Sequence, residues 1–312
     1  MRIDSCRAVG AALVAVAALA GCGSDHPSGD ATTVLSARRA PAARSHVVVL
    51  VMENKESGRV IGSRSAPFLN RLARRGGVAT QSFGLRHPSL PNYIALISGS
   101  TQGITDDCTR CTANGPNIAD QLEAVHRTWG AYLEGLPRPC ARPAFAGRYA
   151  KKHDPFAYDD NIAASPRRCR RRVPLRRLAG DILGDRLPDF AFIAPDLCND
   201  THDCSVRTGD RFLSHVVPAL LSALGPHGFL VVTYDEGDSD RGCCGGSNGG
   251  RIPTVIAGRD VRPGGRMTQP IDQYGVLASI EDAFGLPRLG AARDPQHGNL
   301  APLFRSNRVP RL

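Results

Sequence analysis

Aromatic residues are scarce in this chain: they make up 5% of its 312 residues, and only one of them is a tryptophan. None lies among the seven arginines of residues 165–177, although the whole sequence carries a net charge of +10. Proteins that hold nucleic acid combine a basic surface with aromatic side chains on which bases stack. The absence of aromatic residues here therefore argues against a nucleic acid partner. We interpret the stretch as an exposed basic loop that meets anionic lipid headgroups or wall polymers.

The apolar run at residues 8–20 is too short for a comfortable membrane-spanning helix followed by a stop signal. Arg2 and Arg7 precede it and LAGC ends it at Cys22, which is the pattern of a secretory signal whose end resembles the bacterial lipobox. We expect residues 1–22 to be a lipoprotein-type signal peptide. A lipid on Cys22 would then anchor the exported protein to the outer face of a membrane. The alternative is a plain signal peptide and a secreted protein.

Residues 23–44 show no hydrophobic periodicity and are rich in glycine, serine, proline, alanine and arginine. This composition is typical of a flexible spacer that holds a folded domain away from a membrane. No second linker and no internal repeat divide the remaining chain. We therefore expect one domain at residues 45–305, which is long enough to bury a single large core.

The chain has ten cysteines, of which Cys6 and Cys22 belong to the leader. The eight that remain form an even set, which in an exported protein predicts disulfides. Short-range closure favours Cys108–Cys111 and Cys198–Cys204, with Cys140–Cys169 closing a longer loop. Adjacent Cys243 and Cys244 would pair only in a strained turn, so their connectivity stays open. A zinc site on the CTRC segment is the alternative, but the sequence lacks a matching second half.

Strongly apolar strands alternate with helical segments along the domain. Near-continuous runs of valine, isoleucine and leucine predict strands that are buried on both faces, and hence an α/β fold with a largely parallel sheet between helix layers. The strands are expected at residues 47–52, 189–196, 229–235 and 252–258, and the helices at 65–77, 118–129, 211–224 and 271–286, with a further helix that follows the turn at Ser89. Ser65 is the expected N-cap of the first helix.

Acidic and amide side chains follow two of these strands. Glu53 and Asn54 end the first, and Asp235 and Glu236 end another. Ligands of such sheets gather at the carboxyl ends of the strands, where these oxygens would suit a divalent ion such as Ca²⁺, Mg²⁺, Mn²⁺ or Zn²⁺. Each acidic pair taken alone does no more than end a strand. Ser89, at a helix start, completes the predicted metal-plus-nucleophile site.

Further polar side chains are candidates for handling phosphate and protons. Asn92, one turn after Ser89, is expected to donate to a phosphoryl oxygen, and His87 to help bind phosphate. His202 lies in a predicted disulfide loop, where it would donate a proton to the leaving alcohol. Asp200 and Asp203 are candidate metal ligands or partners that orient His202. The alternative for His202 is a surface histidine without a role.

Five segments, in this order, resemble the phosphoesterase family of bacterial acid phosphatases and phospholipases C, which belongs to the alkaline phosphatase superfamily: VVVLVMENKE, HPSLPNYIALISGST, DLCNDTHDC, VVTYDEGD and GGRIPTVIAG. The resemblance spans about residues 46–286. It implies a three-layer α/β/α sandwich, alkaline-phosphatase-like, and hydrolysis through a covalent phospho-enzyme. It also implies that Ser89 is nucleophile and metal ligand, that Asn92 binds phosphate, and that the remaining ligands are Glu53, Asn54, Asp235 and Glu236.

The sequence departs from the family in its histidines. Many relatives have a histidine before the strand at residues 252–258, where this chain has Arg251, and the two-zinc members of the superfamily use more histidines than can be placed here. These departures favour a single metal rich in oxygen ligands. Arg251 is instead expected to contribute a cation to phosphate binding.

The sequence thus predicts an exported, metal-dependent phosphoric ester hydrolase. A phosphomonoesterase of the acid phosphatase type, acting through a phosphoserine on Ser89, is the favoured activity. A phospholipase C or another phosphodiesterase is the alternative within enzymes. A catalytically silent surface lipoprotein is the alternative from another class, against which the intact nucleophile and acidic pairs argue. The substrate is the expected partner, and no obligate protein partner is evident.

Overall fold

The computed structural model describes residues 44–312. The predicted signal peptide at 1–22, the lipid site at Cys22 and the spacer at 23–44, apart from Arg44, lie outside the described residues. Among residues 44–312, none of the helices combines the length and the apolar character that crossing a membrane requires.

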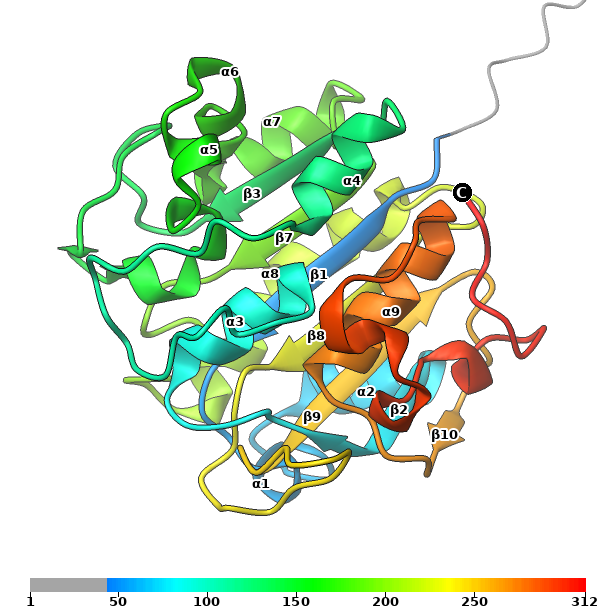
Figure 1. Cartoon of the computed structure of the whole chain (residues 1–312). Helices are drawn as coiled ribbons and strands as arrows, with labels where there is room; N and C mark the ends of the chain where they lie inside the picture. The colour runs from blue at the N-terminus through cyan, green and yellow to red at the C-terminus, as the bar shows by residue number, and fades with distance from the viewer. Residues whose placement is uncertain (1–43) are drawn as a thin grey trace, which may run out of the picture. The chain divides into compact units, whose positions relative to one another are not determined.

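Eight strands form one central sheet in the order β10-β2-β9-β8-β1-β7-β3-β6, and β4 pairs with β5 in a separate hairpin (Figure 1). Within this sheet β9 is antiparallel to both of its neighbours, and the other pairs are parallel. The prediction of a largely parallel sheet is therefore confirmed. The strands are β1 Val47–Met52, β2 Gly77–Phe83, β3 Trp129–Leu133, β4 Phe145–Ala146, β5 Tyr149–Ala150, β6 Arg172–Pro174, β7 Phe190–Ala194, β8 Phe229–Tyr234, β9 Arg251–Gly258 and β10 Gly265–Met267.

Helices cover both faces of the sheet (Figure 1). Alternate residues of β1 show this directly: Val47, Val49 and Val51 pack with α3, α4 and α9. Their neighbours in β1 pack on the other face with α1, α2, α7 and α8. The predicted three-layer α/β/α sandwich is thus confirmed. The helices are α1 Ser57–Val60, α2 Pro67–Arg75, α3 Ser89–Ser98, α4 Ile118–Ala124, α5 Asp160–Ala163, α6 Pro166–Cys169, α7 Leu178–Leu183, α8 Val206–Ala223 and α9 Gln273–Phe284.

The start of α2 differs from the prediction. The helix begins at Pro67 and has Ala66, not Ser65, at its N-cap position. A carboxylate from another helix takes over the capping: Asp210 of α8 accepts hydrogen bonds from the backbone N–H groups of Phe68 (2.9 Å) and Leu69 (2.8 Å). Free N–H groups at a helix start need acceptors, and here tertiary packing supplies them. Local sequence alone does not show such a cap.

All eight cysteines of the described chain are paired. The bonds are Cys108–Cys111, Cys140–Cys169, Cys198–Cys204 and Cys243–Cys244. The first three are the predicted pairs, and the open question of the last two cysteines is settled in favour of a bond between neighbours. Since CTRC forms a disulfide, its sulfur atoms are not available as zinc thiolates.

The chain continues to contribute to the fold beyond residue 305, the expected end of the domain. The backbone N–H of Leu312 donates to the carbonyl of Ala283 in α9 at 2.8 Å. Arg127 donates to the Leu312 carbonyl at 2.7 Å. The C-terminal residues are therefore attached to α9 and to the start of β3.

Candidate active site

Ser89 is the first residue of α3 and is fully buried. Its hydroxyl can donate to Glu53 Oε2 at 3.0 Å or to Glu236 Oε1 at 3.2 Å. These two acids follow β1 and β8, which pair in parallel with Met52 opposite Tyr234. The start of a helix favours negative charge, so the predicted nucleophile lies where an anion would be stabilised, beside acids from both predicted strand ends.

The residues next to these acids leave buried oxygen atoms without partners. The backbone N–H of Asn54 donates to Asp235 Oδ1 at 3.2 Å. Asn54 Oδ1 and Asp235 Oδ2 are buried, and neither has a hydrogen-bond partner. Buried polar atoms normally have partners, and leaving one unsatisfied costs free energy. Oxygen atoms of this kind, beside a serine hydroxyl, fit a divalent cation.

The acids of this site also repel one another. Burial, and then the charges of Asp235 and Asp200, raise the pKa of Glu53 well above its usual value. Burial also raises the pKa of Asp235, and burial together with Asp235 raises that of Glu236 to about 7. Carboxylates that crowd together in a low dielectric resist ionisation. A bound cation would compensate their charge, so the electrostatics support the same fit.

His153 and Asp200 extend the set of possible ligands. His153 Nε2 lies 3.2 Å from Glu53 Oε1, and its Nδ1 lies 3.3 Å from Asp200 Oδ2. Ligand atoms of these three residues lie within 4.8 Å of one another. Burial lowers the pKa of His153 well below its usual value, which favours the neutral imidazole that binds metals. Asp200 was among the sequence candidates, whereas His153 was not.

Lys152 is a second residue that sequence reasoning missed. Its ammonium group lies 3.4 Å from Ser89 Oγ, 3.0 Å from Asp107 Oδ2 and 3.4 Å from His202 Nε2. Burial opposes its charge, but Glu53 and Asp107 outweigh burial and raise the pKa of Lys152. A protonated amine therefore touches the predicted nucleophile.

Lys152 and His153 lie on a short 3₁₀ helix, Lys151–His153, which follows the β4–β5 hairpin. Tyr93 of α3 stacks on His153 with ring centroids 5.2 Å apart and donates a hydrogen bond to Glu53. No strand end or helix start marks this segment in the sequence. The available signal was a histidine beside two lysines, flanked by the aromatic residues Tyr149 and Phe156 in a chain that has few of them.

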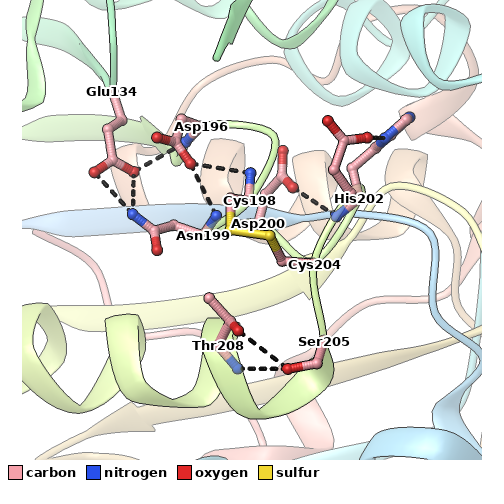
Figure 2. Close-up of a disulfide and its surroundings, with 10 residues drawn as sticks. Glu134, Asp196, Cys198, Asn199, Asp200, His202, Cys204, Ser205 and Thr208 are labelled. Carbon is pink, nitrogen blue, oxygen red and sulfur yellow. Dashed lines mark hydrogen bonds and ion pairs between the residues drawn. A yellow bond between two sulfur atoms is a disulfide. The ribbon is translucent and has the colours of Figure 1, made fainter.

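His202 lies in the loop closed by Cys198–Cys204, at the same edge of the sheet (Figure 2). Its Nδ1 is 2.7 Å from Asp203 Oδ1, and its backbone N–H donates to Asp200 Oδ1 at 2.7 Å. Figure 2 also shows Asp196 at the start of this loop, which accepts from the backbone N–H groups of Cys198 and Asn199. A disulfide and side-chain hydrogen bonds thus hold this loop, and Asp203 is in contact with the imidazole that it was expected to orient.

Asn92 and His87 lie beside Ser89 but contact protein groups. The Asn92 amide accepts from the backbone N–H groups of Leu85 and Arg86 and donates to the Arg86 carbonyl at 2.7 Å. It thus shapes the turn that precedes Ser89. His87 Nδ1 is paired with Glu236, and its Nε2 is 3.2 Å from the Ser239 carbonyl. Burial opposes protonation of His87, but that carbonyl and Glu236 raise its pKa.

Arg251 is the first residue of β9. Among the described residues, no hydrogen bond or ion pair joins its side chain to Ser89. Its backbone N–H donates to Glu56 Oε1 at 3.2 Å, and its side-chain Nε is buried without a partner. Its role in phosphate binding stays a prediction.

Comparison with known proteins gives a consistent picture. The Phosphoesterase family profile matches residues 62–287. The chain is 36% identical over 252 residues to a phosphatidylinositol-3-phosphatase of Mycobacterium tuberculosis, covering 80% of this chain and 79% of that protein. It is 29% identical over 232 residues to an acid phosphatase of Aspergillus fumigatus, covering 70% of this chain but only 51% of the fungal protein.

Solved structures agree on the fold. A protein of the alkaline phosphatase superfamily from Vibrio parahaemolyticus has a TM-score of 0.50 at 14% identity, over 77% of this chain and 66% of its own. The lipoteichoic acid synthase LtaP of Listeria monocytogenes has a TM-score of 0.52 at 12% identity, over 79% and 73%. With the family match over most of the chain and the relatives named as phosphatases, the chain belongs to the phosphoesterase family, has the fold of the alkaline phosphatase superfamily and is a hydrolase of phosphoric ester bonds.

Proposed function

We propose that the protein is a metal-dependent phosphomonoesterase that acts through a phosphoserine on Ser89. The observation that carries the proposal is the position of the Ser89 hydroxyl. It lies at the start of α3, within hydrogen-bond reach of two carboxylates and of the Lys152 ammonium group. A nucleophile needs a nearby base, and a phosphoryl group needs nearby positive charge. This arrangement offers both.

The residues proposed to hold a divalent ion are those with crowded or unsatisfied oxygen atoms at the two strand ends, together with the serine at the start of α3: Glu53, Asn54, Asp235, Glu236 and Ser89. When bound, such an ion lowers the pKa of a hydroxyl ligand and offsets phosphoryl charge. His153 and Asp200 lie close enough to complete or enlarge the ligand set.

In the first step Ser89 Oγ forms a bond to phosphorus, and the bond from phosphorus to the ester oxygen breaks. The hydroxyl proton passes to one of the two carboxylates that accept its hydrogen bond. Lys152 and the N–H groups at the start of α3 stabilise the phosphoryl oxygens. The leaving alcohol takes a proton from His202, which Asp203 orients.

In the second step water attacks phosphorus, the bond to Ser89 Oγ breaks, and phosphate leaves. The serine regains a proton, and His202 is the group placed to accept one from the attacking water. His87 and Asn92 take part indirectly in this scheme, since they hold Glu236 and the turn before Ser89. Arg251 is proposed to add positive charge once substrate is bound.

Monoester specificity is favoured because both relatives are named as phosphatases, one a phosphatidylinositol-3-phosphatase and the other an acid phosphatase. A phospholipase C or other phosphodiesterase activity is the alternative from the sequence. The silent-lipoprotein alternative does not explain why a serine, two acidic pairs and a lysine converge at one buried place.

The experiment is an assay of the full chain on p-nitrophenyl phosphate and on its bis-ester, with and without a chelator. Ser89→Ala should lower monoester turnover at least about 1,000-fold, whereas Ser98→Ala, at the other end of α3, should keep it. Lys152→Met should lower turnover by about 100-fold, with Lys151→Met as the matched control. Activity that survives Ser89→Ala would exclude the phosphoserine, and preference for the bis-ester would favour the diesterase.

We also propose that the chain is exported and held at the outer face of a membrane by a lipid on Cys22. Four disulfides in the described domain support export, because such bonds persist in oxidising compartments. Metabolic labelling with a radioactive fatty acid should mark the protein and should fail with Cys22→Ser. Secreted, unlabelled protein would favour the plain signal peptide.

A further inference from the structure

The end of the sheet opposite Ser89 is strongly basic. There β1, β3 and β7 begin and α2 and α8 end (Figure 1). Two cavities open at this end, of about 640 and 320 Å³. No acidic residue lines the larger cavity, and only Asp181 lines the smaller one, within the part of the chain that the structure describes. We call this surface the basic end and define it by five lining arginines without an acidic partner among residues 44–312: Arg44, Arg71, Arg75, Arg170 and Arg259.

Exposed apolar side chains accompany this charge. Among residues 44–312, large hydrophobic side chains that are exposed occur at three positions, and Leu183 is the extreme case at 88%. It ends α7, just before the residues that line the smaller cavity and lead into β7. Val125, 47% exposed, lies just before β3. The third, Phe145, lies in the hairpin near the active-site edge.

The lining of the larger cavity adds apolar surface to the same end. Phe68 and Leu72 of α2, Leu221 of α8 and Ala257 of β9 line it together with exposed arginines. A cavity with an apolar interior and a basic rim matches a molecule that has an anionic head and an apolar tail. Lipids of that kind are the components of an anionic bilayer.

We propose that the basic end docks on an anionic phospholipid bilayer, with Leu183 inserted at the interface and Ser89 on the far side of the domain. Each arginine near such a surface gains attraction from the negative potential, and exposed apolar side chains gain by leaving water. A soluble polyanion would interact favourably with the arginines. It would leave the exposure of Leu183 and the apolar lining of the cavity unexplained.

The course of the chain agrees with this orientation. Arg44, where the described part begins, lines the smaller cavity at the basic end. A lipid on Cys22 would therefore be joined to the domain at this end. Strands of six residues separate the two ends by about 20 Å. Ser89 then faces the aqueous side, and the protein draws its phosphate esters from solution or from an opposing surface.

The first test places a tryptophan at either end of the full lipid-bearing chain. Leu183→Trp and Phe145→Trp are matched, because both sites carry a large exposed apolar side chain, and both variants retain the native Trp129, which is buried in the parent. On phosphatidylglycerol vesicles with brominated acyl chains, the tryptophan at position 183 should be quenched and shifted to the blue. The tryptophan at 145 should be unaffected. Equal quenching at both positions, or quenching only at 145, overturns the proposed orientation.

The second test measures the charge contribution without the lipid. In the full chain with Cys22→Ser, Arg71→Glu/Arg75→Glu should weaken binding to phosphatidylglycerol-containing vesicles by at least about 25-fold, or about fivefold for each arginine. Arg207→Glu/Arg211→Glu, the same charge change near the start of α8, should leave binding unchanged. If both pairs weaken binding equally, or if the parent binds phosphatidylcholine as well as phosphatidylglycerol, the proposal fails.

Hydrolysis of p-nitrophenyl phosphate serves as the folding control for these variants, since none of the changed residues belongs to the active site. If Arg71→Glu/Arg75→Glu abolishes this hydrolysis, Arg71→Gln/Arg75→Gln is used in its place. Its binding to the vesicles should be weaker by about 25-fold. Binding of soluble polyphosphate without binding of vesicles would identify the basic end as a polyanion site and would also overturn the proposal.

Discussion

Buried charge is left unbalanced in the active site and is balanced in the arginine-rich stretch at 165–177. At the carboxyl ends of the strands, buried acids crowd together and leave Asp235 Oδ2 and Asp200 Oδ2 without partners. In the arginine-rich stretch at 165–177, by contrast, buried charge is neutralised: Arg172 pairs with Asp154, and Arg168 with Asp120 and Glu123. Unbalanced charge inside a protein is costly unless a ligand compensates it. The imbalance therefore marks the place where a ligand belongs.

The structure corrects the prediction that residues 165–177 form a single exposed basic loop. From sequence it is one exposed basic loop, yet Arg172 is fully buried and Arg168 is largely buried. Of the exposed members, Arg170 belongs to the basic end. One stretch thus divides into structural and surface arginines, and the two kinds should respond differently to substitution.

Asp235→Asn should produce the largest effect. Turnover of p-nitrophenyl phosphate should fall at least about 1,000-fold, because a proposed ligand is lost. The metal-free protein should nevertheless become more stable, by about 1 kcal/mol or roughly 2–4 °C, because one of several crowded buried acids is neutralised. Activity assays and thermal unfolding of chelator-treated protein measure the two effects.

Asp181→Asn is the matched change at the basic end, where Asp181 lines the smaller cavity. Asp181 accepts a hydrogen bond from Tyr132 at 3.1 Å and pairs with Arg186 at 3.3 Å, so its charge is compensated. This variant should lose some stability and keep full activity. If Asp235→Asn also destabilises the metal-free protein, then other groups balance the negative charge of the active-site acids, and the hydrogen bonds and ion pairs described above do not include them.

Arg172→Met should have the next largest effect, on stability. The guanidinium Nε donates to both oxygens of Asp154 at 3.0 Å, and Nη2 donates to the Ala141 carbonyl at 2.8 Å. Removing it leaves a buried carboxylate without its cation, which typically costs about 3–5 kcal/mol. Denaturant unfolding measures the loss.

Arg167→Met is the control within the same stretch. Its side chain is 75% exposed and lies 3.4 Å from Glu123, and an exposed pair of this kind contributes less than about 1 kcal/mol. Equal losses for the two variants would mean that burial does not decide the contribution of an arginine here.

The parts of the site that sequence could predict are those with a strong local pattern. Glu53 and Asp235 each follow a run of buried strand residues, and Ser89 starts a helix. Parallel strands place their carboxyl ends at one edge, so these positions could be brought together without a structure. The same patterns gave the layers and the parallel sheet.

The remaining parts depend on packing between distant segments. Lys152 and His153 come from a 3₁₀ turn without periodicity and reach the site only because it packs against α3. The cap of α2 comes from Asp210, about 140 residues away, where local sequence suggested Ser65. Asn92 was expected to contact phosphate, but its amide is occupied by the turn at 85–88. Short motifs identify residues and not their contacts.

Glu281 separates the effect of burial from that of crowding and should give the smallest of these changes. It is fully buried in α9, accepts a hydrogen bond from the Leu289 N–H at 2.7 Å, and leaves Oε2 without a partner. Burial raises its pKa to about 8, and the folded state therefore keeps a proton that the unfolded chain has released above its usual pKa. Stability from this group is consequently lost as the pH rises toward 8.

Glu281→Gln does not titrate and can still accept from Leu289. It should match the parent near pH 4 and become more stable than the parent by about 2 kcal/mol near pH 6, as measured by unfolding across this range. A constant difference at all pH values would show that burial alone does not hold the proton on a carboxyl group in this protein, and the raised pKa values at the active site would then have to come from crowding.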